Sequence, residues 1–129
     1  MNTLMKTEEL IRRLELNTTQ YEKLTLEVLG LVEASEAFLR GLADKRYLID
    51  KKILAEPKEY PNESKREQAR REMLGTDPLY VQLAQDEAGI EINIRRKKTE
   101  LQVIEFQTGT FKRILEYRAS ESKEVRDGK

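Results

Sequence analysis

The chain has 129 residues, the length of a single domain, and 37% of them are charged, against about 25% in a typical soluble protein. Its 24 basic and 24 acidic residues cancel, so no overall charge draws it to nucleic acid or to an anionic membrane surface. The absence of cysteine and histidine excludes disulfides, zinc sites built from those residues, thiol nucleophiles and histidine bases. No apolar stretch reaches the roughly 20 residues of a membrane-spanning helix, and we expect a cytoplasmic protein with no membrane contact.

Long helices are expected towards both ends of the chain, because the prolines all lie between residues 57 and 78. The first helix is predicted over residues 7–54, with Leu10, Ile11 and Leu14 on one face. The tetrapeptide TQYE (19–22) matches a capping box, which leaves open whether this helix breaks near Asn17 or continues.

A connector over residues 55–77 follows, with a short, highly charged helix predicted at 63–74. Gly75 is expected to end that helix in the left-handed conformation, and Asp77 followed by Pro78 is typical of a new helix start. The second long helix is predicted over residues 78–118. Residues 119–129 lack apolar periodicity and are expected to form a disordered tail, so that 1–118 is one domain.

The stretch GIEINIRRKK (89–98) alternates isoleucine with polar residues, as a β-strand does. The alternation covers only Ile90, Ile92 and Ile94, and the sequence offers no second strand to pair with it. A longer pattern of apolar residues at steps of three and four runs through the same segment, which favours a helix.

The fold class that these patterns predict is all-α: a long antiparallel helical hairpin, similar to a coiled coil, with a short helix near its tip. Placing the end of the first helix opposite the start of the second defines a register. That register pairs Leu42 with Ile90, Phe38 with Ile94, Lys45 with Glu87 and Ser35 with Lys97. A shift by one heptad would put Glu87 against Phe38, and burying an unpaired charge costs several kcal/mol.

A second apolar stripe remains outside this seam and predicts that two hairpins dimerise into a four-helix bundle. The alternative is that this stripe packs on the short helix and the N-terminal segment. The candidate dimer contacts are Val81, Ala88, Ile92, Val103, Phe106 and Ile114.

Two basic bands, residues 65–71 and 95–98, are candidates for contacts with nucleic acid or with a partner protein. The candidate residues are Lys65, Arg66, Arg70, Arg71, Arg95, Arg96 and Lys98. In the band at 65–71, glutamates three or four residues from the arginines favour ordinary ion pairs on a solvated helix instead. The four consecutive residues 95–98 turn through about 300° on a helix, so they cannot form one flat patch. Lys97 falls on the hairpin seam, where we expect it to join a polar layer.

Glu33 and Glu36 form an E-x-x-E pair whose carboxylates lie one helical turn apart. This pair resembles the first half of the metal-binding pattern of all-α nucleotide pyrophosphatases of the MazG and dimeric dUTPase type. The resemblance implies a Mg²⁺-dependent nucleotide hydrolase, but the later E-x-x-D of that pattern is absent here.

The function we expect is that of a small non-enzymatic interaction or adaptor protein, without cofactor or bound metal. Its expected partners are a second copy of itself and an unidentified protein, in the manner of bacterial or phage accessory proteins. A nucleic-acid-associated accessory protein is the alternative, and the Mg²⁺-dependent hydrolase is the third.

Overall fold

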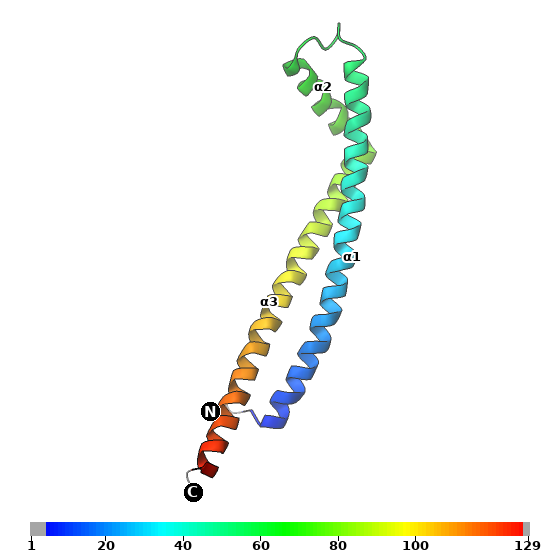
Figure 1. The fold of residues 1–129 in the computed structure, drawn as a ribbon. Coiled ribbons are helices and arrows are strands. Elements are labelled where there is room, and N and C mark those ends of the chain that lie inside the picture. Colours follow the sequence, from blue (N-terminus) through cyan, green and yellow to red (C-terminus); the bar gives the residue numbers. More distant parts are fainter. Residues whose placement is uncertain (1–4, 128–129) are drawn as a thin grey trace. The chain divides into compact units, whose positions relative to one another are not determined.

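Helices and their short connections make up the protein over the residues that its computed structural model describes, 5–127 for the backbone and 5–122 for the side chains. The helices are α1 (Thr7–Leu54), α2 (Glu63–Thr76) and α3 (Pro78–Asp127), as Figure 1 shows. No strand occurs in this range, so the all-α prediction is confirmed, and the alternating isoleucines lie inside α3. None of the helices in the described range has the length and apolar content needed to cross a membrane.

The first helix passes Asn17 without a break. The hydroxyls of Thr18 and Thr19 donate hydrogen bonds to the carbonyls of Leu14 and Glu15 in the preceding turn. These threonines therefore act as interior helix residues and not as a cap. Of the two alternatives left open by the sequence, the continuous helix is the one observed.

Asp77 starts α3 in the way that the sequence predicts. Its Oδ1 accepts hydrogen bonds from the backbone N–H groups of Leu79 and Tyr80, at 3.0 and 3.2 Å. Pro78 occupies the first helical position, where its missing N–H costs nothing.

The end of α2 differs from the prediction. Asn62 caps its start, with the side-chain oxygen accepting from the N–H of Lys65 at 2.9 Å. The expected left-handed end at Gly75 is wrong, because the helix continues to Thr76 and no described glycine has a positive φ. The chain passes from α2 to α3 through extended backbone at the single residue Asp77.

The third helix extends beyond its predicted end at residue 118. Residues 119–127, expected within a disordered tail, continue α3 to Asp127. No glycine or proline interrupts this stretch, so its residues have no strong intrinsic preference against a helix. Residues 128–129 of the predicted tail lie outside the described residues.

The chain divides into two compact units, and α1 and α3 contribute to both. Unit 1 comprises the described residues of Met1–Leu29 and Arg96–Lys129. Unit 2 comprises Gly30–Arg95, and it contains α2. The expectation of one domain over residues 1–118 stays a prediction.

Unit 2 has its apolar core where α2 packs on the end of α1. The buried residues of this core are Ile49 and Ile53 of α1 and Ala69 of α2, with Tyr60, Met73 and Leu74 packed around them. Beside this core, Arg70 of α2 donates a hydrogen bond to the carboxylate of Asp50 of α1. The last turns of α1 therefore have α2 as their partner.

The helix register predicted for unit 2 is wrong. Lys45 forms its ion pair with Asp77 at 3.1 Å, and Glu87 accepts a hydrogen bond from Ser35 at 2.7 Å, so the expected pair of Lys45 with Glu87 is not formed. The cause is α2, which packs on Ile49 and Ile53 near the end of α1. Because these residues already have a partner, α3 begins earlier along α1, opposite Lys45. The observed pairing is close to the one-heptad shift that the sequence had disfavoured.

Unit 1 consists of the first part of α1 and the second part of α3, with Leu10, Leu24 and Ile104 buried. Hydrogen bonds between side chains join the two helices there. They include Lys97 to Glu27 at 2.7 Å, Tyr21 to Glu105 at 2.9 Å, Arg118 to Thr7 at 3.1 Å and Asn17 to Thr108 at 3.4 Å. Lys97 thus has Glu27 as its partner and not Ser35, the predicted one.

Candidate interaction surface

The basic band of α2 is partly used inside unit 2. Arg66 donates to the carbonyl of Tyr60 and lies 3.8 Å from the carboxylate of Glu63. The Asp50 carboxylate raises the pKa of Arg70 through their hydrogen bond. Lys65 and Arg71 are exposed. Two of the four predicted basic contacts therefore serve the fold.

The basic run at residues 95–98 is split between the units. Arg95 is an exposed residue of unit 2, whereas Arg96 and Lys98 are exposed residues of unit 1. Their neighbour Lys97 is hydrogen-bonded to Glu27, which lowers the pKa of Glu27 and raises that of Lys97. Lys97, which was expected on the seam between the two long helices, therefore has the Glu27 carboxylate as its partner.

The acidic pair Glu33 and Glu36 lies exposed on α1. Among the described residues, no group of three or more carboxylates is arranged to hold a metal ion. Within the described residues, the tertiary structure thus brings no third carboxylate to Glu33 and Glu36 that would complete a metal site like that of the nucleotide pyrophosphatases.

Exposed apolar side chains gather along α3 in unit 1. Residues spaced three or four apart share one side of a helix, and we name the set at 103, 106, 110, 114 and 117 the α3 apolar stripe. Its exposed apolar members are Val103, Phe106, Ile114 and Tyr117, and the half-buried Thr110 lies at its centre. Phe106 is 71% exposed and Val103 51% exposed, although burying side chains of this size is worth about 1.5–3 kcal/mol each.

The six predicted dimer contacts fall into two sets. Val103, Phe106 and Ile114 come together in the α3 apolar stripe of unit 1. The others, in unit 2, are the half-buried Val81 and the exposed Ala88 and Ile92. Unit 1 therefore has the more continuous apolar surface on α3.

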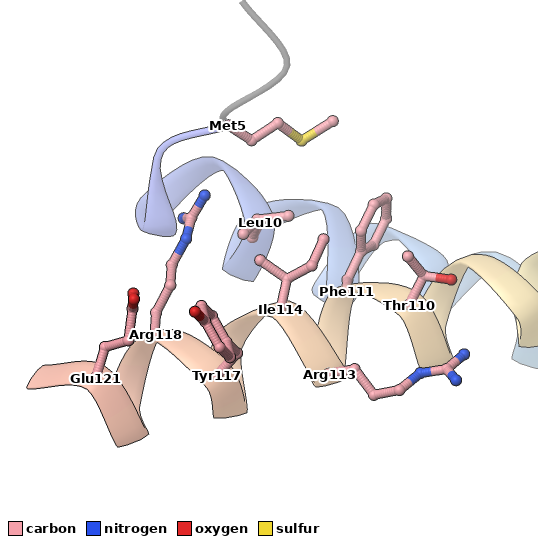
Figure 2. A pocket seen from close by; sticks show the side chains of 9 residues that line it. All are labelled: Met5, Leu10, Thr110, Phe111, Arg113, Ile114, Tyr117, Arg118 and Glu121. Atoms are coloured by element: carbon pink, nitrogen blue, oxygen red, sulfur yellow. The ribbon is translucent and has the colours of Figure 1, made fainter. Parts of the chain in front are cut away.

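A groove of about 450 Å³ adjoins the α3 apolar stripe within unit 1. Figure 2 shows Ile114 on α3 pointing toward Leu10 of α1, with Phe111 and Met5 beside them. Thr110, Ile114 and Tyr117 of the stripe line this groove as well. The stripe and the groove thus form one continuous surface, largely apolar.

Charged groups border one end of the groove. Arg118 projects into it and donates a hydrogen bond to the hydroxyl of Thr7 at 3.1 Å. Glu121 lies one helical turn after Tyr117, and its carboxylate raises the pKa of the Tyr117 hydroxyl. An apolar floor with a polar rim is the usual anatomy of a protein-binding surface.

The sequence placed Tyr117 in the second apolar stripe, although not among the six candidate dimer contacts, and it did not predict the groove. The signal for Tyr117 was its position three residues after Ile114, which continues the stripe. The groove had no signal, since it depends on how Met5 and Leu10 meet α3. Comparisons of this chain with protein-family models, with curated proteins and with solved structures found no match.

Proposed function

We propose that this protein is a non-enzymatic helical interaction protein of the cytoplasm, an adaptor of the kind found among bacterial and phage accessory proteins. It acts as an antiparallel helical hairpin that associates through exposed apolar surface into a dimeric four-helix bundle. The observation that carries the proposal is the α3 apolar stripe, whose most exposed member, Phe106, is 71% exposed.

An apolar stripe of this kind is costly on a chain that is otherwise rich in charge. Of the residues of the whole chain, 37% are charged. Exposed apolar residues that gather on one side of a helix mark a binding surface more often than scattered ones do. The helix pairing within unit 1, through contacts such as Lys97 to Glu27, supports a preorganised surface. Preorganisation reduces the entropy that binding costs.

Nucleic-acid binding has less support from the same structure. Arg66, Arg70 and Lys97 each form an ion pair with a carboxylate of their own unit. Affinity for a phosphate backbone depends on the number of phosphates that basic side chains neutralise, so this use of charge weakens the band at 65–71, whereas at 95–98 it engages Lys97. That alternative stays a prediction.

The proposal is tested by affinity capture from the native host lysate with matched baits. The wild type, Phe106→Asp and the control Lys112→Asp each serve as bait, since Lys112 is an exposed residue of the same helix outside the stripe. We expect a protein that binds the wild type and the control but not Phe106→Asp. Its direct binding is then measured with both purified proteins. If no captured protein, this chain included, depends on Phe106, the proposal is wrong.

A further inference from the structure

We propose that the α3 apolar stripe binds a second copy of this chain, with the two α3 helices antiparallel and related by a two-fold axis at Thr110. This inference rests on the proposed function and names one partner, its orientation and its register. Three features of unit 1 support it: the spacing of the stripe, the charges at its ends and the groove beside it.

The spacing of the stripe is symmetric about Thr110. Val103 lies seven residues before Thr110 and Tyr117 seven after it, while Phe106 and Ile114 lie four residues to either side. An antiparallel copy centred on Thr110 therefore places Phe106 opposite Ile114 and Val103 opposite Tyr117. A two-fold interface requires such self-complementarity, because the same residues must serve both sides.

The charges beyond the stripe distinguish the two possible directions. In the antiparallel arrangement, Glu100 of one copy comes close to Arg118 of the other, and Arg96 close to Glu121. Symmetry doubles both pairs. A parallel arrangement would instead set each of these four residues beside its own copy, and like charges placed together oppose association.

The groove provides a place for the most exposed apolar side chain. Phe106 of one copy faces Ile114 of the other, and Ile114 lines the groove together with Leu10 and Phe111. A phenylalanine ring buries about 150–250 Å² when it packs in such a site. Each copy thus supplies one ring and one groove, so two equivalent contacts form.

Cysteine cross-linking tests the orientation, because the chain has no cysteine of its own. Val103→Cys and Tyr117→Cys are made in full-length chains that carry tags of different mass, and the two proteins are mixed and oxidised. We expect the mixed disulfide to dominate. Each variant alone should form little disulfide, since residue 103 and its symmetry copy are about 21 Å apart along antiparallel helices and a disulfide needs Cα atoms within about 7 Å.

Lys112→Cys, at an exposed residue outside the stripe, is the control and should not cross-link with either variant. Circular dichroism checks that every variant stays helical. Strong cross-linking of Val103→Cys with itself would show a parallel pair and overturn the inference. Equal yields from all combinations would indicate random collision, and that result overturns it as well.

Sedimentation velocity separates this inference from the proposed function. The wild type and Lys112→Asp should sediment as dimers, and Phe106→Asp should weaken the dimer by at least about tenfold in dissociation constant. A monomeric wild type overturns the inference. If a different captured protein still depended on Phe106 in that case, the interaction function would stand without the dimer.

Discussion

Ser35 donates a hydrogen bond to the carboxylate of Glu87 at 2.7 Å, and both side chains are 8% exposed, one on α1 and one on α3 of unit 2. A buried carboxylate is stable only when its oxygens have partners. No buried side-chain oxygen or nitrogen among the described residues lacks a partner, so the pair is accommodated at this depth.

Removing the serine hydroxyl should expose the cost of burying this carboxylate. We expect Ser35→Ala to lower the free energy of unfolding by about 1–3 kcal/mol, measured by urea titration, because Glu87 loses its donor. The double variant Ser35→Ala with Glu87→Met should regain much of that loss. Ser120→Ala, at an exposed residue of α3, is the control, and an equal effect there would contradict the explanation.

The register itself can be measured by intramolecular cross-linking. A chain with Ser35→Cys and Glu87→Cys should form a disulfide under mild oxidation more readily than a pair taken from another register, because residues 35 and 87 face each other across the two helices. A chain with Lys45→Cys and Glu87→Cys represents the register that the sequence predicted. Lys45 lies about 15 Å further along α1 than Ser35, so this second chain should remain reduced. Efficient closure of the second pair would restore the predicted register.

The contact between α2 and α1 should depend on Ile53. Ile53 is 1% exposed in the core shared with Ala69, whereas its neighbour Leu54 is 64% exposed. We expect Ile53→Ala to lower the free energy of unfolding by about 2–5 kcal/mol and Leu54→Ala to change it by less than about 0.5 kcal/mol. Urea unfolding followed by circular dichroism gives both values. Similar losses in the two variants would show that α2 does not pack as described.

The free energy of unfolding should depend on pH through the carboxylate of Asp77. The N–H of Tyr80, followed by the ammonium of Lys45, holds the pKa of Asp77 below its usual value. A carboxyl whose pKa is lowered by folding stabilises the fold above its unfolded pKa, about 3.9, and that contribution disappears as the pH falls through the folded pKa. The loss therefore begins near the unfolded value and ends below the folded one.

The comparison of the wild type with Asp77→Asn measures this contribution. The asparagine keeps an oxygen that can cap α3, but it has no charge for Lys45. We expect the wild type to have the higher Tm at pH 7, by a few degrees, and the gap to close between about pH 5 and pH 2. A gap that stays constant over this range would contradict a role for the charge.

Nucleic-acid binding remains open to a direct measurement. The interaction proposal predicts no salt-dependent gel shift with double- or single-stranded DNA or RNA at low salt, for the wild type or for Arg95→Glu with Arg96→Glu. A shift by the wild type that weakens with salt and disappears in the double variant would establish the alternative. Arg71→Glu, at the exposed face of α2, would then show whether the other basic band takes part.

The sequence alone determined the helices and most of their limits. Local chemistry decides such features: Pro78 and the capping Asp77 begin α3 whatever packs on it, and apolar spacing distinguishes a helix from a strand around Ile92. The same spacing placed Val103, Phe106 and Ile114 on a shared side of α3, where the structure has them exposed.

Only the tertiary structure decided how the helices align. The apolar pattern repeats every heptad, so neighbouring registers differ by few contacts, and the choice depends on what else competes for the same residues. Here α2 packs on Ile49 and Ile53, and α3 therefore starts opposite Lys45. As a result, Glu87 lies beside Ser35 and accepts its hydrogen bond. The groove at Leu10 follows from packing for the same reason, because its walls come from residues about a hundred positions apart in the chain.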